Sequence, residues 1–159
     1  MKNPSTRSAP SSPAQAAKKP KGSSKPPEPG EVLNYSYLWK REYRDRRDDG
    51  AKDRPVTVVL LTVSRGGMSL VHVVLITTKE PGAGDVAIEV PQAVRRQLGL
   101  SGDRSWIVVS EWNRYAWPGY DTRPIPSREP STSYGFLPSS LLRRVLDAMI
   151  AVGVGPATE

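Results

Sequence analysis

Between residues 31 and 112, apolar residues alternate with polar ones or run together in short blocks, a pattern typical of β-strands. The pattern predicts strands over residues 31–38, 55–63, 69–77, 86–90 and 105–112. The second and third strands are so dense in Val, Leu and Ile that we expect them in mid-sheet, with both faces covered. Ser64-Arg65-Gly66-Gly67 joins them and is typical of a hairpin turn.

Two helices are also predicted. A short helix begins at Pro91 and ends at Gly99, a residue suited to the left-handed position that closes a helix. A longer helix begins at Ser139 or Ser140, either of which is a good N-cap, and its apolar residues recur at helical spacing. Residues 114–134 are punctuated by prolines and are predicted to be irregular.

This set of elements predicts a mainly β protein with helices. The strands mostly lack helical crossovers, so an alternating β-α-β fold is not expected. We expect a small, partly open barrel with the C-terminal helix packed on it, formed by residues 30–155. Residues 1–29 are rich in Pro, Ser and Lys and cannot bury enough surface to offset their ordering entropy, so they are predicted to be a disordered basic arm.

The net charge on its own is weak evidence about function. The formal net charge is +7 at pH 7, which invites a nucleic-acid interpretation. Residues 1–29 hold six basic residues and one acidic residue, however, so the rest of the chain is only mildly basic. The arm is either a solubilising tail or a nonspecific hook for polyanions.

The composition excludes several classes of site. The chain has no cysteine and one histidine, so disulfides, thiolate zinc sites and multi-histidine metal sites are excluded. No apolar run approaches the roughly 20 residues of a membrane span, and the N-terminus lacks the apolar region of a secretory signal. A cytoplasmic protein is therefore expected.

The polar ends of two neighbouring strands carry the candidate chemistry. Arg54 opens the second strand, and Thr77 and Thr78 close the third. Because a hairpin makes these strands antiparallel, we expect the three residues at one edge of the sheet, beneath the charged loop 39–53. A guanidinium, a hydroxyl and a nearby carboxylate suit phosphoryl chemistry without a metal. A structural Arg–carboxylate pair with Thr residues at strand ends explains the placement equally well.

Other conspicuous residues are interpreted from their surroundings. His72 lies five residues before Thr77, so strict alternation places the two on opposite faces, and His72 is expected to be structural. Trp39, Trp112 and Trp117 can stack on unpaired bases or, equally, anchor a core or a dimer interface. Trp39, beside the basic loop, is the best stacking candidate. The basic residues of the loop can track phosphates or pair with neighbouring carboxylates; these are Arg44, Arg46 and Arg47.

The order of several motifs resembles the MazF/PemK toxin family over residues 30–152. Two further motifs, Leu38-Trp39 followed by Glu42 and then Trp117-Pro118-Gly119, resemble its PemK-like plasmid-maintenance or growth-inhibitor branch. The motifs that carry the family resemblance are Gly30-Glu31-Val32, Lys52-Asp53-Arg54-Pro55, Ile76-Thr77-Thr78, Ser105-Trp106-Ile107-Val108-Val109 and the closing helix.

The resemblance implies an SH3-like small barrel of the MazF/PemK/CcdB type, commonly a homodimer. It implies the toxin of a type II toxin–antitoxin system, a metal-independent endoribonuclease that cleaves single-stranded RNA or mRNA at a short sequence through the 2′-hydroxyl, without a cofactor. The usual partner is an antitoxin whose acidic tail covers the RNA groove. Arg54 and Thr77 match catalytic residues of the family. The expected RNA-binding residues are Trp39, Arg44, Arg46, Arg47, Lys52 and Thr78.

The chain departs from the family in its proton-transfer groups. Where some members use an Arg and an Asp, it has Val108 and Ser110. Asp48 lies about where others have a His, Glu111 replaces a frequent Gln, and Glu42, Asp48 or Glu111 can serve as the base. The alternative function is a non-catalytic binding module of the same fold, either a gyrase-poisoning toxin or a decayed toxin that regulates by binding an antitoxin.

Overall fold

The computed structural model describes residues 25–37, 52–119 and 122–153. Most of the charged loop expected over residues 39–53 lies outside these ranges, as do most of the predicted arm and the last residues of the predicted barrel domain. Six predicted site residues therefore lie outside the described part of the chain: Trp39, Glu42, Arg44, Arg46, Arg47 and Asp48.

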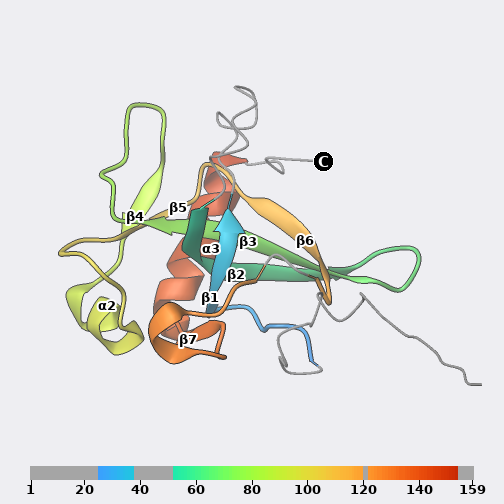
Figure 1. Cartoon of the computed structure of the whole chain (residues 1–159). Coiled ribbons are helices and arrows are strands. Elements are labelled where there is room, and N and C mark those ends of the chain that lie inside the picture. Colours follow the sequence, from blue (N-terminus) through green and yellow to red (C-terminus); the bar gives the residue numbers. More distant parts are fainter. Residues whose placement is uncertain (1–24, 38–51, 120–121, 154–159) are drawn as a thin grey trace, which may run out of the picture.

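The described residues form a mainly β fold with two α-helices, as the apolar pattern predicts (Figure 1). The elements in chain order are β1 (Glu31–Tyr37), β2 (Lys52–Val63), β3 (Ser69–Thr77), β4 (Ala87–Glu89), α2 (Gln92–Leu98), β5 (Trp106–Val108), β6 (Asn113–Trp117), the 3₁₀ turn η3 (Pro126–Arg128), β7 (Ser133–Phe136) and α3 (Ser139–Val152). No helix in these ranges is long and apolar enough to span a membrane.

The strands form one antiparallel sheet in the order β4-β5-β3-β2-β1-β7. The β2–β3 hairpin is its centre, which confirms the mid-sheet prediction, and its turn uses Gly67 at a φ of 81°. On the side away from β2, β3 pairs with two different strands. Residues 69–73 of β3 pair with β6, whereas Ile76 and Thr77 pair with β5.

The sheet curls into a half barrel. Tyr35 of β1 and Tyr115 of β6 have ring centroids 5.2 Å apart, although β2 and β3 lie between their strands in the sheet. Tyr35 also forms a β-bridge with Thr122, in the segment that follows β6. Next to it, the Arg123 N–H donates to the carbonyl of Asn34 at 2.8 Å, so the two ends of the curled sheet approach one another.

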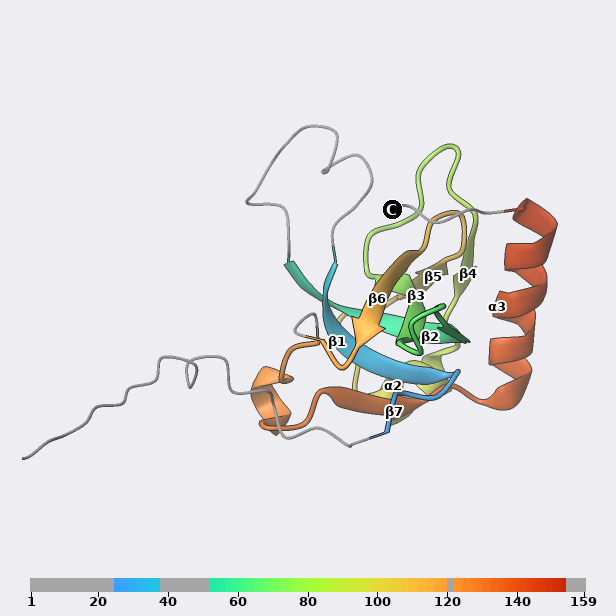
Figure 2. The same cartoon turned by 90° about the vertical axis from the view of Figure 1, so that its right-hand side faces the viewer.

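Two apolar clusters lie on the two faces of the curled sheet. Alternate β3 residues serve each one, as expected for a strand: Val74 and Ile76 belong to the cluster that includes Leu98 of α2 and Val145 of α3. The other cluster is formed by side chains from β1, β2, β3 and β6, among them Tyr35, Val56, Leu75 and Tyr115. Figure 2 shows α3 standing along one side of the strands.

Two predictions about the second half of the chain were wrong. The strand expected over residues 105–112 is only Trp106–Val108, because the chain leaves β5 to start β6, which pairs farther along β3. Residues 114–134, expected to be irregular, contain most of β6 and the start of β7. The prolines of this segment lie between those two strands, where they end strands without preventing them.

The helix ends match the sequence only in part. Gly99 closes α2 in the left-handed conformation with a φ of 71°, as predicted. For α3, the prediction of a serine N-cap was wrong: Pro138 holds that position and no side chain caps the helix. β2 also begins earlier than expected, at Lys52, because Pro55 pairs opposite Asn34 inside the strand.

Candidate functional site

The β2–β3 ladder ends at the Val56–Leu75 pair, two residues before Arg54 and Thr77, and Thr77 pairs with Trp106 of β5. Val56 pairs with Leu75, and continuing this register by two residues places Arg54 opposite Thr77. On the other side of β2, Arg54 pairs with Tyr35. Because alternate residues of a strand share a face, Arg54 and Thr77 lie on the face of Val56 and Leu75. Leu100 and Tyr134 belong to the opposite face, so the residues of the two faces meet only at this edge of the sheet. The hairpin geometry expected from sequence is confirmed.

A hollow of about 290 Å³ opens around these strand ends. Strand residues form one side of it, and the turn after α2 together with Tyr134 of β7 forms the other, so segments distant in sequence enclose it. We call it the strand-end cleft, and its lining residues are Asp53, Arg54, Pro55, Ile76, Thr77, Thr78, Leu100, Ser101, Ser105 and Tyr134. The predicted grouping of Arg54 with Thr77 and Thr78 is therefore confirmed.

The polar groups of the cleft are arranged for an anionic ligand. The Thr77 hydroxyl oxygen accepts the Lys79 N–H at 3.1 Å, which leaves the hydroxyl proton to donate. Arg54 is half-buried at the edge of the cleft, and Asp53 beside it is exposed. A guanidinium and a hydroxyl donor suit a phosphate oxygen, while the carboxylate of Asp53 can accept a proton.

A close contact with glycine holds the turn after α2 against the strand ends. Gly102 has a φ of 88°, and a Cβ there would lie 2.9 Å from Thr78 Cγ2, so a larger residue would push the turn away from the cleft. Arg95 Nη1 donates to the Gly102 carbonyl at 2.6 Å and fixes the turn to the helix. The short helix α2 therefore shapes the wall that carries Leu100 and Ser101.

Tyr134 supplies a phenol to the same cleft. Burial raises the pKa of Tyr134; the positive charge of Arg128 opposes this shift and the negative charge of Asp53 adds to it. The phenol is therefore a neutral donor at physiological pH. Asp53, Ser101, Ser105 and Tyr134 were not predicted as site residues from the sequence. The position of Asp53 beside Arg54 was a visible signal, whereas Tyr134 lies in a segment expected to be irregular.

Two predicted site residues do not line the strand-end cleft. Lys52 is exposed at the start of β2, one residue before Asp53, and Glu111 lies in the connection between β5 and β6. Their roles stay predictions. Trp112 and Trp117 do not line it either: Trp112 packs on the cluster beneath the helices and Trp117 on the opposite one.

His72 occupies the opposite face from Thr77, as strict alternation predicts. It is 5% exposed, its Nε2 lies 2.9 Å from Thr62 Oγ1, and its ring centroid is 4.6 Å from that of Trp112. Burial lowers the pKa of His72, and the charge of Arg114 lowers it further. This environment keeps the imidazole neutral in the folded protein, which fits a structural role.

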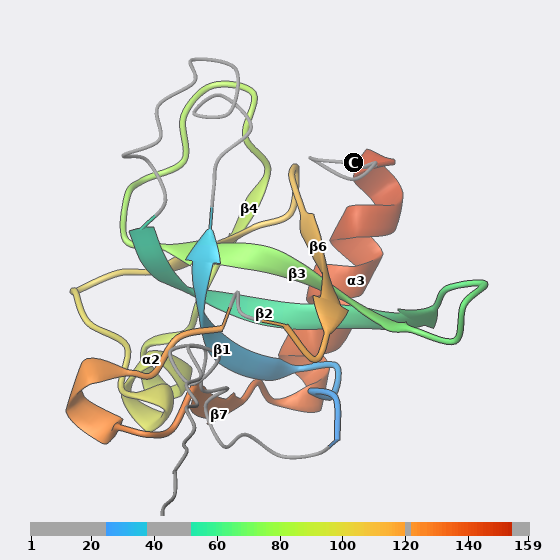
Figure 3. The ribbon, with the colours of Figure 1, turned by 45° about the vertical axis from the view of Figure 1, so that its right-hand side comes forward.

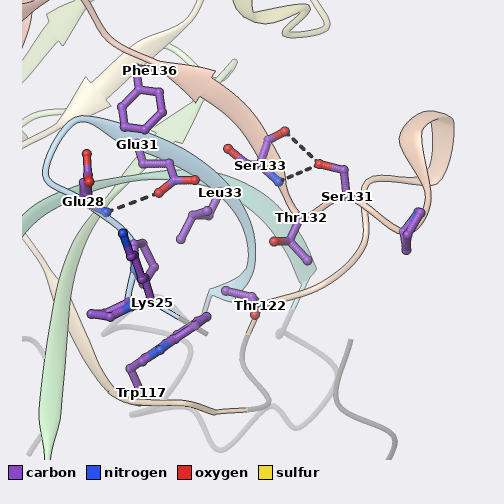
Figure 4. Close-up of a pocket in the computed structure, with 13 residues that line it drawn as sticks. Lys25, Glu28, Glu31, Leu33, Trp117, Thr122, Ser131, Thr132, Ser133 and Phe136 are labelled. Atoms are coloured by element: carbon purple, nitrogen blue, oxygen red, sulfur yellow. Dashed lines mark hydrogen bonds between the residues drawn. The ribbon is translucent and has the colours of Figure 1, made fainter. Parts of the chain in front are cut away.

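A larger hollow, of about 450 Å³, lies away from these residues between β1, β7 and the end of β6 (Figure 4). Leu33, Trp117 and Phe136 contribute apolar surface, and the Glu28 N–H donates to the Glu31 carboxylate at 3.2 Å. None of its described lining residues is an arginine. We select the strand-end cleft in preference to this larger hollow because, of the two described linings, only that of the cleft combines a guanidinium, hydroxyl donors and a carboxylate.

Within the described ranges, no three His, Asp or Glu side chains gather closely enough to hold a metal ion. No family model, no curated protein and no solved structure matches this chain.

Proposed function

We propose that this protein is the toxin of a type II toxin–antitoxin system and cleaves single-stranded RNA in the strand-end cleft. The observation that carries the proposal is the convergence of Arg54, Thr77 and Thr78 around one hollow, with Asp53 at its edge. The motif resemblance to the MazF/PemK family supports it. The curled sheet with a closing helix is consistent with the finer fold assignment, an SH3-like small barrel of that family's type.

The proposed reaction transfers a phosphoryl group within the RNA. The 2′-hydroxyl oxygen attacks the adjacent phosphorus while its proton passes to a carboxylate, for which Asp53 is the candidate in the cleft. The bond from phosphorus to the 5′-oxygen breaks, and that oxygen takes up a proton. Arg54 stabilises the negative charge of the five-coordinate phosphorus, and Thr77 donates to a phosphate oxygen. The products are a 2′,3′-cyclic phosphate and a 5′-hydroxyl.

The proposal extends to partners that have the chemistry expected of such a toxin. A homodimer in the cytoplasm would be inhibited by an antitoxin with an acidic tail. Such a tail would compete with RNA phosphates for Arg54, because carboxylates and phosphates bind a guanidinium in the same bidentate way.

The test incubates the purified protein with a long single-stranded RNA in the presence of EDTA. New ends are labelled with polynucleotide kinase, which marks 5′-hydroxyls, and are then mapped. We expect cuts at a short recurring sequence, lost in Arg54→Ala and kept in Arg65→Ala. Arg65 is the matched control because it is an exposed arginine at the opposite end of the same hairpin. Intact RNA with a folded wild-type protein would contradict the nuclease proposal.

One observation favours the alternative, a binding module without cleavage. Among the described residues, no histidine lines the strand-end cleft and a single carboxylate does, that of exposed Asp53. A cleft of this kind can hold a phosphate without moving a proton near neutral pH. RNA that binds in an Arg54-dependent way but stays intact would select this alternative.

A further inference from the structure

Tyr134 forms part of the cleft wall that faces the strand residues. It comes from β7, whereas Arg54 and Thr77 come from the central hairpin, so the ring approaches the cleft from another part of the sheet. The ring is half-buried and packs against the cluster beneath the helices. None of the described residues hydrogen-bonds the Tyr134 hydroxyl.

Arg128 contacts both the ring and the backbone of Tyr134. Its guanidinium carbon lies 5.4 Å from the centroid of the Tyr134 ring, within the range of a cation–π contact. Its Nη1 donates to the Tyr134 carbonyl at 3.4 Å, and its Nη2 donates to the Leu98 carbonyl at 3.0 Å. One guanidinium therefore joins β7 to the end of α2, the two elements that carry the wall of the strand-end cleft.

Gly99 makes room for this guanidinium. A Cβ at Gly99 would overlap Arg128 Nη2, and the φ of 71° disfavours any other residue there. The glycine that ends α2 thus serves two purposes, because it closes the helix and admits the Arg128 side chain. Arg128 therefore contacts both parts of the wall, and the Tyr134 ring beneath its guanidinium also packs against the core.

We propose that Tyr134 is a substrate-binding residue, whose hydroxyl donates a hydrogen bond to a backbone oxygen of the RNA, and that Arg128 is its positioning residue. This inference rests on the proposed RNA-binding function of the cleft. The raised pKa of Tyr134 is consistent with it, because the phenol keeps its proton over the whole physiological range. Tyr134 would add a neutral donor on the side of the RNA that Arg54 and Thr77 do not reach.

The test separates binding from cleavage by using a 2′-O-methyl RNA oligonucleotide, which lacks the nucleophile and cannot be cut. Its affinity is measured by fluorescence anisotropy for wild type, Tyr134→Phe and Arg128→Ala, and thermal melting checks that each variant folds. We expect Tyr134→Phe, which keeps the ring and its contact with Arg128, to weaken binding roughly tenfold, the effect of one lost hydrogen bond. Tyr115→Phe, the same change at a residue outside the cleft, should leave the affinity unchanged.

The role of Arg128 is tested by a double-mutant cycle. Arg128→Ala alone should weaken binding by a similar factor, but it should add little to Tyr134→Phe, because the hydroxyl that it positions is already absent. Arg144→Ala, an exposed arginine on α3, controls for the loss of one positive charge. Additive effects of the two changes would show that Arg128 acts through its charge or through folding, and would overturn its positioning role.

The outcomes distinguish this inference from the function on which it rests. Wild-type protein that neither binds nor cuts RNA would end both proposals. RNA binding that depends on Arg54 but is equal in wild type and Tyr134→Phe would overturn the role of Tyr134 and leave the proposed function intact.

Discussion

The two ends of the β2–β3 hairpin are built from the same kind of strand but differ in their surroundings. At the open end, Arg54 and Thr77 meet a wall formed by the turn after α2 and by Tyr134 of β7. At the turn end, which extends beyond the other strands in Figure 3, apolar side chains remain in solvent: Leu60 is 48%, Val63 72% and Met68 51% exposed. The comparison teaches that a strand end becomes a site when a second segment encloses its polar groups.

The largest expected effect is a loss of stability when a buried side chain in the middle of the hairpin is removed. Leu75→Ala removes a fully buried side chain between the two ends and should lower the free energy of unfolding by about 3 kcal/mol. Val63→Ala at the exposed turn end should change it by less than about 0.5 kcal/mol. Urea denaturation measures both, and equal losses would contradict the assignment of the core.

At the open end, Arg54→Ala should lower the rate of RNA cleavage by about 100- to 1,000-fold, as expected for the loss of one charge-stabilising donor. The unfolding free energy should change little, because Arg54 is half-buried at the cleft edge. Arg65→Ala at the turn end should leave the rate unchanged. Initial cleavage rates are measured for both variants at saturating RNA. A similar loss of rate in both would contradict the claim that only the open end of the hairpin is a site.

Thr77 should have a smaller effect. Thr77→Val keeps the shape of the side chain and removes the hydroxyl, so we expect a loss of about 10- to 100-fold in cleavage rate. Thr77→Ser restores the hydroxyl and should restore most of the rate. If Thr77→Ser cleaved RNA as slowly as Thr77→Val, the packing of the Thr77 methyl group, and not its hydroxyl donor, would account for the lost cleavage rate.

The enclosing wall is tested by two glycines that end helices in the same conformation. Gly99 has a φ of 71° and Gly153 a φ of 65°, so alanine at either position should cost about 1 kcal/mol of stability. Only Gly99→Ala also displaces Arg128, whereas a Cβ at Gly153 meets open space. We expect Gly99→Ala alone to weaken RNA binding, which anisotropy with 2′-O-methyl RNA measures; equal affinities would contradict the role of Arg128.

The smallest expected effect comes from His72 in the turn half of the hairpin. The pKa of His72 is lowered in the folded state, so the unfolded chain takes up a proton at a higher pH than the folded protein does. Stability is therefore complete above about pH 6.5 and falls as the pH drops below it. Denaturation at pH 7.5 and pH 5.5 measures this loss. Because His72 is the sole histidine, His72→Gln should remove most of the slope between those values.

The sequence predicts the hairpin end well because the information is local. Alternating apolar residues around a Gly-Gly turn set the strands, and the register then places Arg54 opposite Thr77. The wall could not be predicted in this way. Tyr134 reaches the cleft, and Arg128 reaches Tyr134, only after the chain folds back from β6. Their segment is punctuated by prolines, which conceal a short strand such as β7.

The closure of the half barrel has a consequence for the order of folding. Asn34 is 3% exposed, and its side-chain amide donates to the Pro124 carbonyl, 90 residues away in the chain. Its backbone N–H donates to Thr132 and its carbonyl accepts from Arg123, so all three polar groups depend on the same late segment. During synthesis β1 therefore lacks these partners until the ribosome has passed Thr132. Such nonlocal pairing slows folding, and a nascent chain can close this side of the half barrel only after Thr132 has been synthesised.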